Sequence, residues 1–278
     1  MEKKKRKLKK SVKKFILTIF LIITISIMIF CIIKILFWAN DNKKTSEITK
    51  DINEQVTINT SEEKIIDIID PDAPVEDPIW SYDSSLVKNV DLSKLYAINN
   101  ETVGWIIVNN TKVNYPVVQH ADNDFYLNRS FDKKFNNAGW VFLDYRNNNK
   151  EMDKNTIIYA HGRIDNSMFG SLRKTLNSSW YGNPDNYIIN FSTENYNSLW
   201  QIFSIYKIPT TSDYLQVKFS SDDEYLNWLN MLKNRSIYDF KTNVNSDNKI
   251  ISLSTCYDDN EKLVVHAKLI KLQNKTGE

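Results

Sequence analysis

The chain has 278 residues, two cysteines and three histidines, and its 36 basic side chains nearly balance 34 acidic ones. The formal charge of +2 averages two unlike parts, because the first 38 residues hold 10 of the basic side chains and 1 of the acidic ones. The remaining residues hold 26 basic and 33 acidic side chains, a formal charge of −7. This balance excludes the basic surface that a nucleic-acid-binding domain needs, so we expect no nucleic acid as a partner.

The N-terminal residues predict a membrane anchor. A basic tail at 1–14 precedes Phe15 to Ile33, which contain no charged side chain. About 20 apolar helical residues cross a hydrocarbon core of about 30 Å, and a basic flank stays cytoplasmic. A cleaved signal peptide is the alternative, but its apolar core is shorter, roughly 7 to 15 residues, and ends at a small-residue cleavage site. We therefore predict a cell-membrane protein with a transmembrane helix at 15–38 and the rest of the chain outside the cytoplasm.

The next segment, residues 39–79, predicts a stalk. It is polar and acidic, and it ends in the proline-spaced run PDAPVEDP. Such a segment buries too little apolar surface to offset its ordering entropy. We expect at most a transient helix within it, around 61–69. The remaining residues, 80–278, are enough for one extracytoplasmic domain with a well-buried core.

The pattern of that domain predicts a mainly β fold. A helix is expected first, at 84–98, where apolar residues give one loose face. Short β-rich runs then alternate with turn clusters, a spacing typical of a β-barrel or sandwich rather than a parallel sheet. The predicted strands are 105–108, 113–118, 139–143, 156–159, 187–191, 199–208, 250–255 and 263–269.

Two further helices are expected among the strands. The first is short, at 168–176. The second, at 221–233, is better marked, because Ser221 is a typical N-cap and Glu224 stands at the capping-box position. Its large apolar side chains lie on one side, so we expect it to pack on the barrel. The alternative is that it forms one wall of a groove.

Cys256 is the candidate for a reactive group. It ends the first of two strands joined by the polar residues 257–262, the pattern of a hairpin with a longer loop. A small buried core cysteine is the alternative interpretation. Since Cys31 lies in the predicted membrane span, a disulfide between the two does not fit the topology. A lone thiol outside the cytoplasm favours an intermolecular pairing or a working thiol.

A catalytic thiol needs a base, and the chain offers three histidines. His266 lies inside a strand of alternating side chains, where we expect it to be partly exposed. His120 follows a strand end and begins a polar stretch, so it stays a candidate base. His161 ends the run NTIIYAHG, and a strand end at a barrel rim is a place where catalytic groups are commonly held. The pattern favours His161.

Four runs of the sequence carry a family resemblance. They are GWIIVNNTKVNYPVVQHADNDFYL, NNAGWVFLDYRN, NTIIYAHGRIDNSMFGSL and ISLSTC. In this order they resemble the sortases, the membrane-anchored cysteine transpeptidases of Gram-positive bacteria, and look most like class B. The resemblance covers residues 92–271. It implies a sortase-like closed β-barrel with an N-terminal helix and a helical insertion before the strand that carries the cysteine.

The resemblance also implies the site residues. Cys256 is the nucleophile of the signature Thr-Leu-Xaa-Thr-Cys, here with Ser252 in place of the first threonine, and His161 is its histidine. We expect the substrate to be contacted by Ser254, Thr255 and Asn123.

One position departs from the family pattern. Sortases carry an arginine at the start of the strand after the cysteine, and this chain has Lys262 there. Lysine keeps the charge but lacks the planar, two-pronged donor geometry of arginine. Three explanations stand: Lys262 does the work less well, another arginine reaches the site, or the protein is a weakened sortase. We favour the first, because the charge is retained at the expected place.

The activity implied by the resemblance is acyl transfer through a thioester on Cys256. The substrate is a surface protein with a C-terminal sorting signal of the Asn-Pro-Xaa-Thr-Xaa type or a related one, cleaved after its threonine. The acceptor is an amine of a peptidoglycan precursor of the lipid II type. We expect no cofactor and no metal, because His161 and Cys256 do not reach the three or four ligands of a zinc site.

Other classes of function stay open. A papain-like cell-wall peptidase places its cysteine at a helix N-terminus, ahead of the histidine, which is the reverse of the order here. A degenerate sortase that acts as a binding module or a hydrolase is the other alternative. A pure binding module needs no reactive thiol, so the rate at which iodoacetamide alkylates Cys256 separates it from an enzyme.

Overall fold

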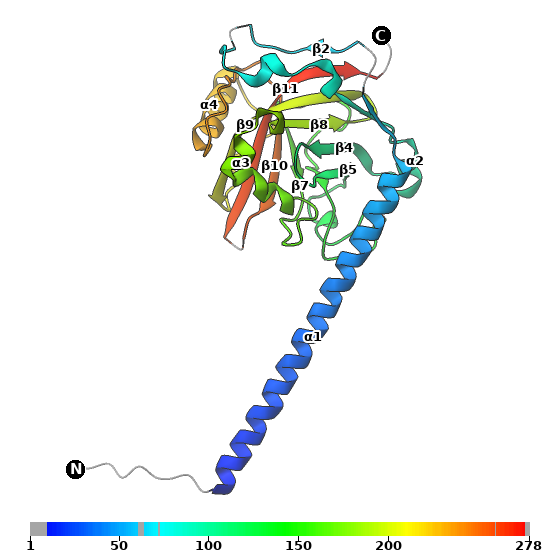
Figure 1. Cartoon of the computed structure of the whole chain (residues 1–278), viewed down its shortest axis with the longest axis vertical. Coiled ribbons are helices and arrows are strands. Elements are labelled where there is room, and N and C mark those ends of the chain that lie inside the picture. Colours follow the sequence, from blue (N-terminus) through cyan, green and yellow to red (C-terminus); the bar gives the residue numbers. More distant parts are fainter. Residues whose placement is uncertain (1–9, 61–63, 72, 259, 276–278) are drawn as a thin grey trace, which may run out of the picture. The chain divides into compact units, whose positions relative to one another are not determined.

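The computed structural model describes residues 10–60, 64–71, 73–258 and 260–275 (Figure 1). Most of the predicted basic tail, the start of the expected helix at 61–69 and one residue of the 257–262 loop lie outside this range. The chain divides into two compact units, Met1–Ser46 and Glu47–Glu278.

A single long helix, α1 (Lys10–Gln55), contains the predicted membrane span. The segment has no glycine or proline to interrupt it, and its apolar part is long enough to cross a membrane. This helix fits a single-pass membrane anchor. It continues 17 residues past the predicted end of the span at 38, through a stretch that the composition had predicted as stalk. Good helix formers such as Lys50 and Glu54, whose charged groups lie 3.7 Å apart at i and i+4, favour this continuation.

The second unit is built around a closed β-barrel, which confirms the predicted fold class. Eight strands follow one another in the order β10-β7-β6-β5-β4-β8-β9-β11, and β11 pairs with β10 to close the ring. The strands are β4 (Thr102–Val108), β5 (Asn114–Val118), β6 (Phe142–Leu143), β7 (Asn155–Tyr159), β8 (Ile188–Ser192), β9 (Tyr196–Pro209), β10 (Ile250–Cys256) and β11 (Glu261–Asn274).

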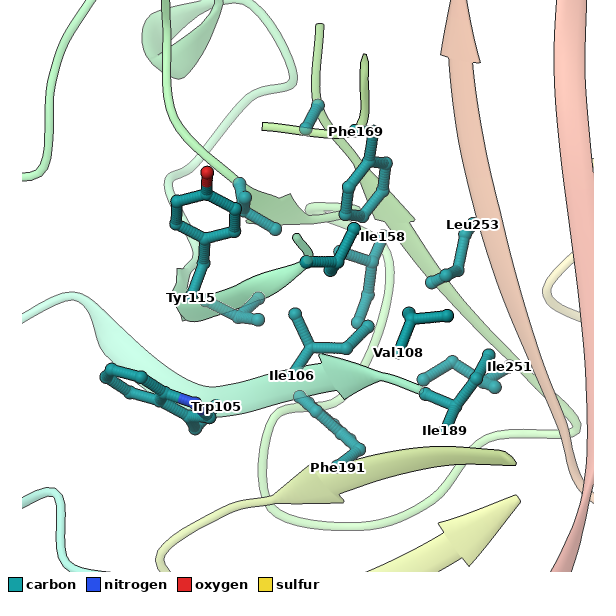
Figure 2. Close-up of a cluster of buried hydrophobic side chains, with 14 of the residues drawn as sticks. Trp105, Ile106, Val108, Tyr115, Ile158, Phe169, Ile189, Phe191, Ile251 and Leu253 are labelled. Carbon is teal, nitrogen blue, oxygen red and sulfur yellow. The ribbon is translucent and has the colours of Figure 1, made fainter. Parts of the chain in front are cut away.

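Alternating side chains of these strands fill the barrel (Figure 2). On β10, Ile251 and Leu253 point into the cluster, where they meet Ile158 of β7 and Ile189 of β8. Burying such aliphatic side chains stabilises the fold by roughly 1.5–3 kcal/mol each. Because successive strand residues face opposite sides, the residues between them, Ser252 among them, face outward from this interior.

Outside the barrel, α4 (Asp222–Arg235) covers one face. The side chain of Ser221 accepts a hydrogen bond from the backbone N–H of Glu224, which confirms the predicted cap. The Glu224 carboxylate in turn accepts from the backbone N–H of Ser220, one residue earlier than a capping box requires. The helix packs on the barrel as predicted, through buried Tyr225, Trp228, Leu229 and Leu232 against Phe203, Tyr206, Ile250 and Val264.

This cover corrects the prediction for His266. We expected a partly exposed position, but the side chain is completely buried. The residues on either side of it, Val265 and Ala267, belong to the barrel core, while Val264 packs under α4. Both faces of β11 are therefore covered, and alternation along the strand does not separate inside from outside there.

The prediction of a helix at 84–98 is wrong over its first half. A 3₁₀ turn at Ser84–Leu86 leads into β3 (Lys88–Val90), and only α2 (Ser93–Ile98) is helical. Lys88 donates its backbone N–H to Asn190 Oδ1 at 2.9 Å, and β3 pairs with β1 (Ile58–Thr60). These distant partners satisfy the backbone groups that a helix would have paired locally.

Several short helical turns connect the strands, and one of them replaces a predicted helix. The helix expected at 168–176 is a 3₁₀ turn at Gly170–Leu176, preceded by Met168 with a positive φ of 50°. Two more short elements follow it, α3 (Ser178–Tyr181) and a 3₁₀ turn at Pro184–Asn186. A further 3₁₀ turn, Phe125–Leu127, lies between β5 and β6.

Part of the predicted stalk packs onto the barrel. Besides β1, it contributes β2 (Ile66–Asp67), which pairs with β11, and a 3₁₀ turn at Pro78–Ser81. The buried carboxylate of Asp77 accepts hydrogen bonds from Ile79 N–H and from Gln201 of β9, at 3.0 and 2.6 Å. The partners of β2 and Asp77 in the barrel lie more than 100 residues away, so the composition of the segment alone does not reveal them.

Candidate active site

The sheet register brings the ends of β7 and β10 together. These two strands are parallel, and Ser254 lies opposite Tyr159. Continued by two residues, this register sets Cys256 beside His161. The Thr255 hydroxyl also donates to the carbonyl of Ala160 at 2.8 Å, which fixes the two strand ends against each other. The thiol and the imidazole therefore come from neighbouring strands at one rim of the barrel.

Gly162 shows how close these strand ends are. A Cβ atom on this residue would lie 1.8 Å from the carbonyl oxygen of Cys256, a distance that no side chain tolerates. The next turn of chain is held in place by Arg173, which donates to the Gly162 carbonyl at 2.8 Å. The run His-Gly in the sequence thus has a steric reason, because only glycine lets the chain after the histidine pass the cysteine backbone.

Lys262 lies directly across the hairpin from Cys256. The two residues are a registered pair of the antiparallel strands β10 and β11, so their side chains share a face. The Lys262 ammonium group lies 2.9 Å from the sulfur of Cys256, within hydrogen-bonding distance. An ammonium donor to a thiolate forms a charge-assisted bond, which is stronger than a neutral one. Cys256 itself is exposed to solvent.

His161 is oriented by backbone groups. Its Nε2 lies 2.7 Å from the carbonyl oxygen of Leu127, so Nε2–H donates to that oxygen. The neutral ring then carries its lone pair on Nδ1, which is the atom able to take up a proton. Gly139, with a positive φ of 62°, packs so closely that an added Cβ would lie 2.9 Å from the imidazole Cδ2.

A cavity of about 700 Å³ opens at this rim. All six side chains singled out in the sequence line it: Cys256, His161, Lys262, Ser254, Thr255 and Asn123. Five further lining residues carried no signal in the sequence, and they come from the loop between β9 and α4. Thr210 to Ser212, Tyr214 and Leu215 form that wall. The preceding loop of the insertion, rather than α4 itself, therefore borders the groove.

The other two histidines lie away from this cavity. His120 stacks on Phe125 with ring centroids 4.0 Å apart, and its Nδ1 lies 3.0 Å from the Glu101 carboxylate. His266 is hydrogen-bonded to Ser252 and to Tyr206, at 2.7 and 2.9 Å. Burial lowers the pKa of His266 to about 3, so the ring is neutral at ordinary pH. Of the three histidines, His161 is the one that lines the cavity.

The arginines of the domain have other partners. Arg129 lies over the Phe125 ring, Arg235 pairs with Asp213, and Arg163 pairs with Asp165. Arg173 donates to backbone carbonyls behind the rim. Lys262 is the cation that lines the cavity among the described residues, and the same described residues contain no group of three or more metal-binding side chains placed around one point.

The fold and the site together define a class of protein: a barrel protein with a cysteine and a histidine on adjoining strand ends. Comparison with known proteins sharpens this class. The family model for the sortase domain matches residues 106–270. Sortase B of Listeria monocytogenes is 33% identical over 184 residues, which cover 65% of this chain and 74% of that protein. Sortase B of Staphylococcus aureus is 37% identical over 182 residues, 64% of this chain and 74% of that protein.

Solved structures agree with these relatives. A crystal structure of sortase B from B. anthracis in complex with AAEK1 matches with a TM-score of 0.66 at 32% identity, over 85% of this chain and 99% of the other. The Staphylococcus aureus sortase B–substrate complex matches with a TM-score of 0.61 at 36% identity, over 65% of this chain and 84% of the other. The chain belongs to the sortase family, and these relatives are class B sortases. At the family level, this is a cysteine transpeptidase fold.

Proposed function

We propose that this protein is a sortase B-type transpeptidase that cleaves a C-terminal sorting signal after threonine and joins the new carboxyl end to a peptidoglycan amine. The observation that carries the proposal is the contact of 2.9 Å between the Lys262 ammonium and the Cys256 sulfur. The parallel pairing of β7 with β10, and the presence of His161 and Cys256 in the lining of one cavity, support His161 as the base. The proposed nucleophile, base and cation, Cys256, His161 and Lys262, all line this one cavity, which supports their acting on one peptide.

The chemistry has two halves. In the first, the Cys256 thiolate attacks the threonine carbonyl carbon, the C–N bond breaks, and the leaving amine takes a proton from the His161 imidazolium. In the second, an acceptor amine attacks the thioester, gives its proton to His161, and releases the thiolate as the new amide forms. Lys262 offers a charged donor to the oxygen that becomes negative in each tetrahedral intermediate.

The partners in this proposal follow from the family. One solved sortase B is complexed with triglycine and another with a substrate, as their descriptions state. For this chain we propose a sorting signal of the Asn-Pro-Xaa-Thr-Xaa type or a related one, and an amine of a lipid II type precursor. The apolar helix α1, with the N-terminus cytoplasmic, would hold the domain at the membrane face where both substrates emerge.

Mass spectrometry tests the proposal directly. The full-length protein in detergent micelles is incubated with a small panel of sorting-signal peptides, and Cys256 is examined for a covalent acyl adduct. We expect an adduct with at least one peptide and its loss on adding triglycine, with a ligated product. An adduct that is released only by water supports the hydrolase alternative. The absence of any adduct, with slow alkylation of Cys256 by iodoacetamide, contradicts the enzymatic proposal and favours a binding module.

A further inference from the structure

A buried carboxylate, paired with a partly exposed guanidinium, lies next to side chains that line the cavity. Asp144 follows β6 directly, and its side chain is fully buried. Arg146 grips it with two prongs: Nε donates to Oδ1 at 2.9 Å and Nη2 to Oδ2 at 2.7 Å. The backbone N–H of Arg146 adds a third bond to Oδ1 at 2.9 Å. The proposed chemistry uses neither residue.

This carboxylate holds two side chains that line the cavity. Its Oδ2 accepts from the hydroxyl of Tyr159 at 2.8 Å and from Nδ2 of Asn123 at 3.1 Å. Both donors border the cavity, whereas Asp144 does not. Burial raises the pKa of Asp144, but the hydrogen bonds from Arg146 and Tyr159 outweigh it and hold that pKa below its usual value. The group therefore stays an anion and an acceptor for these donors.

The orientation of the Asn123 amide follows from its two partners. Nδ2 donates to the Asp144 carboxylate, and Oδ1 accepts the backbone N–H of Tyr145 at 3.0 Å. Turning the amide over would set its oxygen against a carboxylate and its nitrogen against an N–H donor, so one orientation is fixed. The amide keeps one N–H and one lone pair, which is the pair of groups that a peptide backbone can meet.

Arg146 reaches the opposite wall as well. Its Nη2 donates to the carbonyl oxygen of Leu215 at 3.0 Å. Leu215 belongs to the loop between β9 and α4 and lines the cavity from that side. One guanidinium thus joins the Asn123 side of the groove to the insertion side.

We propose that Asp144 and Arg146 are a positioning pair that sets the affinity of the groove for its peptide by fixing Asn123, Tyr159 and the loop at Leu215. This inference rests on the proposed function and concerns the same site. The pair acts on substrate binding and not on the thiol, because the five atoms that donate to the Asp144 carboxylate belong to Arg146, Tyr159 and Asn123.

The test uses Asp144→Asn, which keeps the shape but replaces one acceptor oxygen by a donor. The full-length protein in detergent micelles is assayed on a sorting-signal peptide that acylates the wild type. We expect KM to rise roughly ten-fold, the size of one or two lost hydrogen bonds, with kcat within about two-fold. The rate of Cys256 alkylation by iodoacetamide should not change, since that small reagent needs no groove. Asp239→Asn, in the exposed pair with Lys241 at 2.7 Å, is the matched control and should leave KM unchanged.

A double-mutant cycle identifies the route. If Asp144 acts largely through Asn123, adding Asp144→Asn to Asn123→Ala should raise KM by less than about three-fold, because residues of one network are not additive. Arg146→Lys serves as the second variant should Asp144→Asn fail to fold. It keeps the charge but loses the fork and the bond to Leu215, so KM should rise while kcat is kept.

Each outcome decides the inference. An unchanged KM in both variants, or a fall in alkylation rate that matches a fall in kcat, overturns it and leaves the proposed function intact. Two negative results together would overturn both proposals. The wild type would cleave no peptide, and the Cys256→Ala variant would bind none in a fluorescence-anisotropy assay.

Discussion

Two polar regions on one face of β10 differ in what covers them. Ser252, Ser254 and Cys256 alternate along that face, and their exposure increases from none at Ser252 to open solvent at Cys256. Under α4, Ser252 belongs to a buried hydrogen-bond network, in which its hydroxyl contacts both Asn155 and His266, at 2.6 and 2.7 Å. At the rim, Cys256 faces a cavity, with Lys262 beside it.

The two ends of this face differ in whether another element covers them and not in the type of residue they carry. Asn155 Nδ2 donates to the carbonyl of Gln216 at 2.8 Å, so its Oδ1 is free to accept the Ser252 hydroxyl. His266 Nδ1–H then donates to the Ser252 oxygen, and the hydroxyl of Tyr206 donates to Nε2. Both nitrogens of the His266 ring are therefore used in hydrogen bonds within the protein. These bonds stabilise the barrel, but they leave no ring nitrogen available for proton transfer. His161, partly exposed and held by one carbonyl, keeps a nitrogen for proton transfer.

The largest expected effect is at the open end of this face. Cys256→Ala should abolish peptide cleavage, because the other cysteine of the sequence, Cys31, lies in the apolar helix α1. The fold should persist, as the side chain is small and exposed. Cleavage and the circular dichroism spectrum are measured together, and turnover above about one per cent of wild type would show that the nucleophile is another group.

The next effect separates the histidines. His161→Ala should reduce kcat/KM by roughly 10² to 10⁴, the range for losing general acid–base catalysis. His120→Ala is the matched control and should stay close to wild type, because its ring lies against Phe125 away from the cavity. If the His120 variant were as inactive as the His161 variant, the assignment of His161 as the base would be contradicted.

Lys262 should have a smaller effect on the same assay. Lys262→Ala should lower kcat/KM by roughly 10² to 10³, the range for removing one oxyanion donor. Lys262→Arg should keep or raise activity, because a guanidinium restores the two-pronged donor. Thermal stability should change by no more than about 0.5 kcal/mol in either variant. Full activity of Lys262→Ala would mean that the donor is elsewhere, with Arg129, Arg163 and Arg235 as the next to test.

Changes to the buried hydrogen-bond network around His266 should alter the stability of the fold and not the turnover of peptide. Because the folded-state pKa of His266 is depressed to about 3, its stabilising contribution is full above the unfolded pKa near 6.5 and is lost as the pH falls toward 3. The unfolding free energy should therefore decrease in this window, by at most about 1.4 kcal/mol per pH unit from this group. Urea titrations of the wild type and of His266→Gln measure it. Equal pH slopes for the two proteins would contradict a neutral buried His266.

The barrel itself could be predicted from the sequence, because each of its strands contains a β-rich run bounded by turn residues. The eight predicted strands all exist, and the cap at Ser221 is formed as expected. The hairpin around Cys256 was likewise predicted, and it pairs Cys256 with Lys262. The order of the motifs also predicted the family. These features depend on local patterns of a few neighbouring residues, which a sequence displays directly.

Contacts between distant residues account for the rest. The burial of His266 depends on α4, which begins 44 residues earlier. The helix expected at 84–98 gave way to β3 because β1 and Asn190 supply its partners, and the pair Asp144 and Arg146 matters only through Asn123, Tyr159 and Leu215. The sequence by itself determined the strands, the anchor-like helix and the residue types of the site. Only the tertiary structure decided which imidazole lines the cavity and which polar groups share a wall, because burial and hydrogen bonding are set by whichever segments meet in space.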